Sequence, residues 1–224
     1  RVLKTTGSTV SLSVANTYDG ETRVNGGILD VLNSSALGST VGSTYVDAGT
    51  LRLGKTKVNI SDEQLFLNGQ GVVVGSVAQG ALNVTGSATS FSGTIKLQST
   101  SRINSDSSSF TLNGVSSLGY DSTSGGSGYD LYLGGKGNLY LYKQLDLGTG
   151  KLIKDSTGVL YIRANESVEG VSLVKGSTVL SGATVTTQAA GFTVGTAAAL
   201  SGYGTIAGPV VVKNGVGATL TPGN

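Results

Sequence analysis

The chain of 224 residues contains no cysteine, no histidine, no methionine and no tryptophan, and it has only 2 prolines. Without histidine and cysteine there is no imidazole base, no thiolate nucleophile and no ordinary zinc or copper site. Without cysteine, an exported chain of this size must be stabilised by hydrogen bonds and apolar burial instead of disulfides. Carboxylate chemistry is the catalytic option that these absences leave open.

Charge and long apolar runs are also scarce. The sequence has 15 Lys and Arg residues against 13 Asp and Glu residues, and the basic residues are scattered. Such a sparse and balanced charge predicts no binding to nucleic acid. No stretch of about 18 apolar residues is present, so we expect no direct membrane insertion, and the first residues show no export signal. We interpret the chain as a mature or excised segment whose signal or anchor lies outside it.

What the sequence does contain is glycine, with 36 residues, and short segments in which apolar and polar residues alternate. Alternation with a period of two, closed by Gly, Asn, Asp or Ser, predicts short β-strands. No window long enough for a helix carries apolar residues at helical spacing without an interrupting glycine. The sequence therefore predicts an all-β protein with few and short helices.

The predicted strands recur at a fixed interval, which separates Leu139 from Leu160 and also separates Phe110, Leu131 and Leu152 from one another. This interval is about 20 residues, which is typical of one solenoid coil, and like residues then stack on successive coils. We predict a right-handed parallel β-helix or β-solenoid with about 20 residues per coil and about ten or eleven coils. In this register Phe110, Leu131 and Leu152 form one inward core stack.

A longer repeat is visible when residues 3–29 are aligned with residues 153–180. The two segments share a lysine, Lys4 or Lys154, followed by an alternating strand, an Ala-Asn pair and a glycine-containing turn. No charged, Pro-rich or polar linker divides the chain. We therefore predict that residues 1–224 form one continuous solenoid with about one and a half copies of a unit of about 150 residues.

Residues 10–32, VSLSVANTYDGETRVNGGILDVL, resemble the autotransporter-associated β-strand repeat. The usual form of that repeat is Leu-x-Leu, then Asn-Thr-Tyr-x-Gly-x-Thr, then Val-x-x-Gly-x-Leu. The positions that fit are Leu12, Asn16, Thr17, Tyr18, Gly20, Thr22, Val24, Gly27 and Leu29.

Residues 36–71, 89–112 and 130–165 are also similar to segments of the large proteins that carry this repeat, although the second copy lacks Thr-Tyr after Asn165. The resemblance implies a right-handed β-helix that is exported and displayed outside the cell. It implies no activity, because no catalytic residue belongs to the motif.

The acidic residues mostly stand alone in predicted turns, which disfavours a cleft with several converging carboxylates. The segment nearest to a calcium loop is DSTSGGSGYD at residues 121–130, but its aspartates lie only at its two ends. We interpret this segment as a Ser- and Gly-rich insertion loop. The sequence thus predicts no catalytic residues, no metal site and no cofactor.

Tyrosines that alternate with inward leucines form a candidate binding feature. Tyr132, Tyr140, Tyr142 and Tyr161 are expected to point outward, and Tyr140 and Tyr161 are one coil apart. One interpretation is an aromatic stripe for glycan stacking or for lateral contact between rods. The other, which we favour, is a tyrosine ladder that stabilises neighbouring strands.

Neither end of the sequence shows a capping segment, so we expect the first and last coils to be continued by further chain or by another copy. Our leading hypothesis is a non-enzymatic extracellular structural protein that forms a rod, surface layer or fibre by end-to-end stacking of coils. A second hypothesis is an autotransporter-type adhesin passenger, whose loops such as residues 119–129 bind a glycan or a cell surface. A third is a polysaccharide-degrading enzyme, which only the frequent use of β-helices for that chemistry supports.

Overall fold

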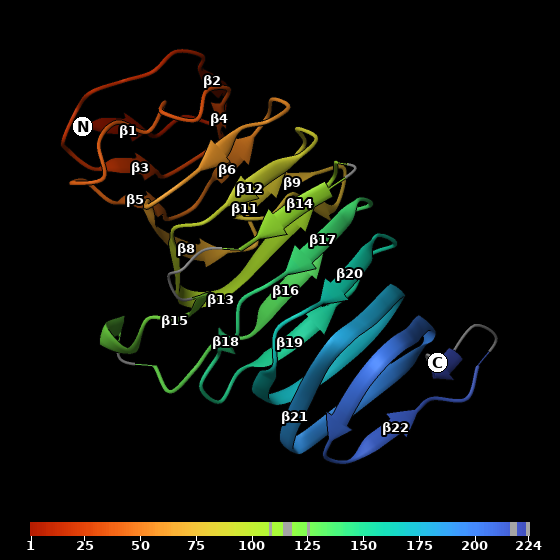
Figure 1. Cartoon of the computed structure of the whole chain (residues 1–224). Helices are drawn as coiled ribbons and strands as arrows, with labels where there is room; N and C mark the ends of the chain where they lie inside the picture. Colours follow the sequence, from red (N-terminus) through yellow and green to blue (C-terminus); the bar gives the residue numbers. More distant parts are fainter. Residues whose placement is uncertain (108, 114–117, 125, 216–218, 223–224) are drawn as a thin grey trace.

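The computed structural model describes residues 1–107, 109–113, 118–124, 126–215 and 219–222. A network of 21 strands is joined by parallel pairing, and two further strands form an antiparallel hairpin. The described residues include one helical turn, the 3₁₀ helix η1 (Ser122–Ser124). The predicted all-β parallel solenoid is therefore confirmed. Figure 1 shows its coils stacked one after another, with the two chain ends at opposite ends of the stack.

Three parallel ladders run along the solenoid, because each coil contributes up to three strands. The first ladder joins β1 (Val2–Lys4), β3 (Thr22–Val24), β5 (Thr44–Val46), β8 (Gln64–Gly69), the first part of β13 (Thr94–Ser105), β15 (Leu118–Tyr120) and β18 (Leu145–Asp146).

The second ladder carries the surface on which the candidate site lies. It joins β2 (Thr9–Leu12), β4 (Ile28–Val31), β6 (Thr50–Leu53), β11 (Leu82–Val84), the second part of β13, β16 (Leu131–Gly134), β19 (Lys151–Lys154) and part of β21 (Glu166–Ala207).

The third ladder begins later in the chain than the other two. It joins β7 (Asn59–Ile60), β12 (Thr89–Phe91), β14 (Ser109–Leu112), β17 (Asn138–Leu141), β20 (Val159–Ile162) and a further part of β21.

Strand β21 has 42 residues and bends around several corners of the solenoid (Figure 1). A straight strand of that length would extend roughly 140 Å. Instead, its residues 170–173 pair with β19 and its residues 177–180 pair with β20. Further along, β21 pairs with β22 (Val210–Val212) and with β23 (Thr219–Pro222). One continuous strand therefore contributes to more than one coil.

Insertions make some coils longer than others. Leu131 pairs with Leu152 on the next coil, and no insertion lies between them. Leu51 pairs with Leu82 across a longer coil, because the hairpin of β9 (Val73–Val74) and β10 (Val77–Ala78) lies within it. Of the predicted insertion loop, the structure describes residues 121–124 and 126–130, which lie between β15 and β16 and lengthen a later coil.

This second insertion corrects the predicted core stack. Leu131 and Leu152 are register partners and are fully buried. Phe110 is also fully buried, but it belongs to the third ladder, where it pairs with Leu139. The sequence distance from Phe110 to Leu131 equals that from Leu131 to Leu152 only by coincidence. The insertion between β15 and β16 lengthens the coil that starts at Phe110, so its register partner is Leu139 and not Leu131.

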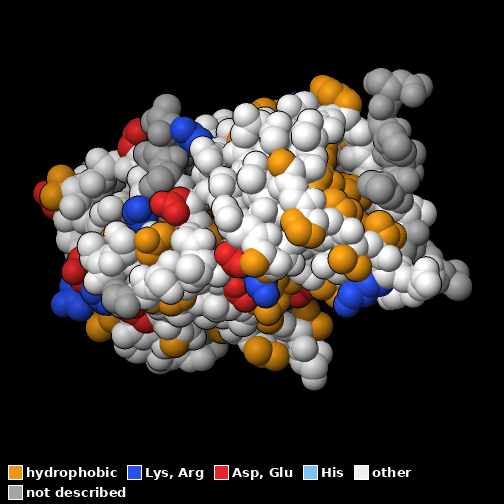
Figure 2. Space-filling model, turned by 90° about the horizontal axis from the view of Figure 1, so that it is seen from below, with side chains coloured by type: hydrophobic (Ala, Val, Ile, Leu, Met, Phe, Trp, Pro, Cys, Tyr) orange, Lys and Arg blue, Asp and Glu red, His pale blue; other side chains and the backbone are white. Residues whose placement is uncertain are grey.

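The interior is a single hydrophobic cluster that extends along the stacked coils. In β17 and β20, Leu139 and Leu160 point inward and are buried, whereas Tyr140 and Tyr161 between the inward residues are partly exposed. The predicted alternation thus positions the core and leaves every second side chain on the surface. In Figure 2 the charged side chains on the visible face are few and scattered, and hydrophobic ones gather toward the end that carries the last strands.

The β9–β10 hairpin projects from the solenoid and is fastened at its base. Its turn residues Gly75 and Ser76 have φ angles of 54° and 68°, as a tight turn with two left-handed residues requires. The Thr50 hydroxyl accepts a hydrogen bond from the N–H of Val72 at 3.0 Å and donates one to the carbonyl of Gly80 at 2.8 Å. The residues on either side of the hairpin are therefore both tied to Thr50 of β6.

Candidate functional site

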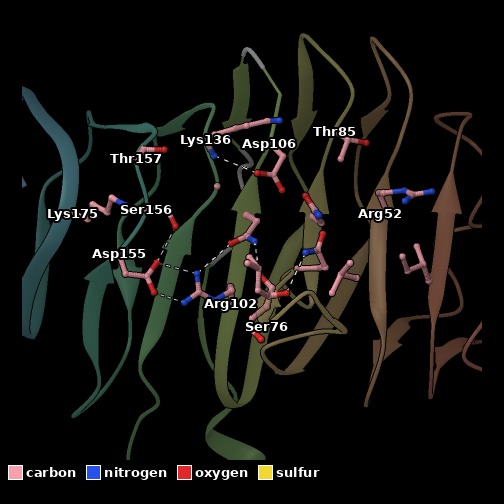
Figure 3. A pocket seen from close by; sticks show the side chains of 18 residues that line it. Arg52, Ser76, Thr85, Arg102, Asp106, Lys136, Asp155, Ser156, Thr157 and Lys175 are labelled. Carbon is pink, nitrogen blue, oxygen red and sulfur yellow. Dashed lines mark hydrogen bonds and ion pairs between the residues drawn. The ribbon is translucent and has the colours of Figure 1, made fainter.

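A groove of about 860 Å³ follows the outer face of the second ladder (Figure 3). The β9–β10 hairpin forms one side, and the turns that follow the second-ladder strands form the other. The residues that line the groove are Ile28, Arg52, Val74, Ser76, Val77, Ala78, Gln79, Asn83, Thr85, Arg102, Asn104, Asp106, Gly135, Lys136, Asp155, Ser156, Thr157 and Lys175.

The floor of the groove contains an ion pair that crosses a whole coil. Arg102 of β13 forms a bidentate pair with Asp155, which follows β19, and its Nη1 lies 2.9 Å from Oδ1. The Arg102 Nε donates to the side chain of Gln70 at 2.8 Å, and the guanidinium lies 5.1 Å from the Tyr132 ring centroid. The intervening strand carries Gly134, where an added Cβ would lie 2.5 Å from the Arg102 Nη1. Glycine is thus required for this crossing.

A second arginine near the floor is paired within its own ladder. Arg52 donates to both carboxylate oxygens of Asp30 on the preceding coil, at 3.0 and 2.7 Å. These hydrogen bonds raise the pKa of Arg52 above its ordinary value. Both arginines of the groove are therefore neutralised by carboxylates of the chain.

Two asparagines lie in register on neighbouring rungs but differ in their hydrogen bonds. Asn104 donates from Nδ2 to the carbonyl of Ala78 at 3.0 Å, and its Oδ1 accepts from Arg102 at 3.4 Å. Asn83 is only 3% exposed, and its Oδ1 has no hydrogen-bond partner among the described residues. Buried polar atoms are normally paired, so Asn83 Oδ1 is an unsatisfied acceptor in a residue that lines the groove.

The rim opposite the hairpin carries two exposed lysines, Lys136 and Lys175. Neither forms an ion pair with any part of the chain that the structure describes. Beneath the rim, the buried Lys154 donates from Nζ to the carbonyls of Ser156 and Lys175, the latter at 3.2 Å. Burial lowers the pKa of Lys154 to about 8. This inward lysine fastens two successive rim turns to each other.

The predicted tyrosine stripe is divided between two ladders. Tyr140 and Tyr161 are stacked on neighbouring strands of the third ladder, with ring centroids 4.6 Å apart and planes inclined by 5°. Arg163 joins Tyr142 to this pair, because its Nη1 donates to the Tyr142 hydroxyl at 2.7 Å and its guanidinium lies 5.5 Å from the Tyr140 ring centroid. Tyr132 lies apart from them, in the second ladder beside Arg102.

A comparable stack on the first ladder was not identified from the sequence. Tyr45 and Phe66 are stacked with ring centroids 4.6 Å apart, and the Arg23 guanidinium lies 4.1 Å from the Tyr45 ring centroid. The signal was present, because residues 44–46 and 65–67 are alternating segments separated by the same interval as Leu139 and Leu160. Outward aromatic and arginine stacks therefore occur on all three ladders, which favours a general role in strand stabilisation.

Glu63 and Glu166 are buried, which the sequence analysis did not predict. Glu63 accepts a hydrogen bond from the Thr44 hydroxyl at 2.8 Å, and burial raises its pKa to about 7. Glu166 accepts from the N–H of Leu145 at 2.8 Å, and burial raises its pKa to about 8. The second oxygen of Glu166 has no partner among the described residues. Neither glutamate lines the groove.

Within the described part of the chain, no cluster of three or more Asp and Glu side chains is arranged to hold a metal ion. The same residues include no helix that is long and apolar enough to cross a membrane. Comparison with known proteins finds no matching protein-family model, no matching curated protein and no matching solved structure.

Proposed function

We propose that this chain is a non-enzymatic structural rod of an extracellular, bacterial surface assembly, and that further coils extend its solenoid at both ends. Three continuous hydrogen-bonded ladders and a single hydrophobic core support a stiff element, because each coil bonds to the next along its length. The further coils belong either to the same polypeptide or to another copy.

The observation that supports this proposal is the exposure of core positions on rungs near both ends of the solenoid. Leu29 is fully buried, but its partner Val10 on the preceding rung is 41% exposed. Phe192 is also fully buried, whereas its partner Val210 on the following rung is 43% exposed. A further coil at each end would cover these aliphatic side chains and pair the strand edges.

Assembly of separate copies would be head-to-tail, since the two ends of a solenoid are different surfaces. A heterologous contact of this kind produces an open filament unless its rotation closes a ring. The proposal is tested with the 224-residue chain by size-exclusion chromatography with light scattering over a range of concentrations, and by electron microscopy. We expect linear oligomers that grow with concentration.

Strand β22 offers a matched pair of variants for this test. Val210 and Val212 occupy inward positions, whereas Val211 between them pairs with the partly exposed Thr193 and points outward. The double variant Val210→Lys, Val212→Lys should shift the chain toward monomer, and Val211→Lys should leave the oligomers unchanged. A wild-type chain that stays monomeric at high concentration, with both end coils protected from hydrogen exchange, would contradict the proposal.

Polysaccharide degradation is the enzymatic alternative, and the chemistry of the groove disfavours it. Glycoside hydrolysis normally requires two available carboxyl groups at a defined separation. Of the described residues that line the groove, Asp106 and Asp155 carry carboxylates, and Asp155 is held by Arg102 through both oxygens. Incubation with acidic polysaccharides and assay for new reducing or unsaturated ends tests this point, and turnover at enzymatic rates would refute a purely structural role.

A further inference from the structure

We propose that the groove on the second ladder binds an acidic polysaccharide, a linear hydroxyl-rich chain that carries carboxylates and lies along the rod axis. The groove extends from β4 to the turn at Lys175, which is roughly 30 Å at the spacing of neighbouring strands. Its length and direction suit an extended polymer that crosses many coils. The inference rests on the groove alone and does not depend on self-assembly of the rod.

Asn83 has an acceptor at the groove that is unpaired among the described residues. Its neighbour Asn104, the same residue type one rung away, has partners for both its oxygen and its nitrogen. Asn83 Oδ1 is buried at the groove without a described partner, although such atoms are normally satisfied. This acceptor requires a hydrogen-bond donor. A sugar hydroxyl can donate, whereas an ionised carboxylate can only accept.

The rim of the groove carries positive charge that the described part of the chain does not neutralise. Arg52 and Arg102 are already paired with Asp30 and Asp155, so they offer little charge to a ligand. Lys136 and Lys175 are exposed and form no ion pair with the described residues. They follow strands that are two rungs apart in the second ladder, which places their turns roughly 10 Å apart along the groove. Asp106 also lines the groove without an ion pair among the described residues, so the unpaired charges there are two positive and one negative. The groove thus keeps a positive balance, and successive carboxylates of a polymer can meet successive lysines.

The hairpin gives the groove an apolar side. Val74 and Val77, paired with each other in the hairpin, line the groove and are among the most exposed large hydrophobic residues of the chain. Exposed aliphatic side chains beside polar groups are typical of ligand grooves. The non-polar C–H face of a sugar ring can pack against this wall while its hydroxyl groups face the floor.

The geometry favours a glycan over the other polymers. A peptide that adds as a β-strand requires a free strand edge, but the inner strands of the second ladder are paired on both sides. Binding of single-stranded nucleic acid normally uses aromatic side chains on which bases stack, and no aromatic residue is among the described residues that line the groove.

The test uses three uronate polymers, polygalacturonate, alginate and hyaluronan, with neutral dextran as a comparison, and measures affinity by calorimetry. We expect at least one uronate polymer to bind and dextran to bind more weakly. The double variant Lys136→Glu, Lys175→Glu should weaken that binding by about tenfold or more. Asn83→Leu should also weaken it, and this loss should persist at high salt because it removes a hydrogen bond and not a charge.

A matched control is the double variant Lys151→Glu, Lys213→Glu, which changes the net charge equally at exposed lysines that do not line the groove. We expect its affinity to equal that of the wild type. Circular dichroism establishes that each variant is folded. The proposal is overturned if none of the three polymers binds, or if the control pair weakens binding as much as the groove pair does.

Discussion

The ionisable side chains inside the solenoid couple its stability to pH. Glu63 and Glu166 have pKa values of about 7 and about 8 when folded, above the ordinary 4.5, because burial disfavours their charged form. The stability that these neutral glutamates contribute is fully present below pH 4.5. It is lost as the pH rises through their folded pKa values. Burial lowers the pKa of Lys154 to about 8, from an ordinary value of 10.5. The buried charge of Lys154 therefore opposes folding below pH 8, and this penalty fades between pH 8 and pH 10.5.

We therefore predict that the free energy of unfolding falls from about pH 5 to pH 8, by at most about 1.4 kcal/mol per pH unit for each glutamate. Urea denaturation at pH 5, 6, 7 and 8 measures this slope. The Glu166→Gln variant should reduce the slope and should be more stable than the wild type at pH 8. Glu169→Gln, a partly exposed position on the same strand, is the control and should preserve the slope. A flat profile in the wild type would contradict the prediction.

The two faces of a single strand differ in their effect on stability. In β16, Leu131 is fully buried, and its neighbour Tyr132 is partly exposed beside Arg102. We predict that Leu131→Ala lowers the free energy of unfolding by about 2–5 kcal/mol and that Tyr132→Ala lowers it by about 1 kcal/mol. Leu131→Asp should prevent folding, because it places a charge between apolar layers. Equal losses for Leu131→Ala and Tyr132→Ala in urea titrations would refute this assignment of the two faces.

At the scale of strands, outward aromatic stacks join consecutive rungs. Tyr140 on β17 and Tyr161 on β20 face each other, so each ring covers part of the other. This arrangement supports the interpretation of the tyrosines as a ladder that stabilises strands. It also leaves the groove, and not the tyrosines, as the better candidate for ligand binding.

A double-mutant cycle with Tyr140→Ala and Tyr161→Ala tests the role of this stack. We predict a coupling energy of about 0.5–1.5 kcal/mol in the free energy of unfolding, the range expected for an aromatic pair. The pair Tyr132 and Tyr161, which lie on different ladders, serves as the control and should be additive within about 0.5 kcal/mol. Absence of coupling between Tyr140 and Tyr161, or binding of a glycan that depends on them, would show that the stack has another role.

At the scale of the whole molecule, a solenoid is a one-dimensional stack in which each coil contacts only its neighbours. Coils in the middle are covered on both sides, whereas Val10 and Val210 mark rungs whose core positions are open. Local opening should therefore cost least at the ends and most in the centre.

Amide hydrogen exchange can measure this gradient. We predict that amides of β22 exchange faster than those of β16, and that protection of β22 rises with protein concentration because end-to-end contacts cover it. The Val211→Lys variant should retain this concentration dependence, whereas the double variant at Val210 and Val212 should lose it. Uniform protection along the chain would contradict the nearest-neighbour description.

The sequence alone determined the strand alternation, the parallel stacking and several register pairs, among them Leu139 with Leu160 and Tyr140 with Tyr161. It also pointed to the Lys4 and Lys154 repeat. Both lysines are buried, and each donates to one carbonyl within its own turn and to another on the next coil. The register pairs are predictable because the distance between like positions is set by the number of residues in an uninterrupted coil.

Only the tertiary structure decided the partner of Phe110 and the composition of the groove. An insertion of unknown path changes the number of residues per coil, so the fixed interval fails wherever a hairpin or loop enters. The pair of Arg102 and Asp155 spans 53 residues and crosses an intervening coil, and such contacts have no periodic signature in the sequence. The different hydrogen bonding of the two asparagines likewise depends on how the β9–β10 hairpin folds. The hairpin carbonyl of Ala78 accepts from Asn104, whereas no donor of the hairpin reaches Asn83 Oδ1.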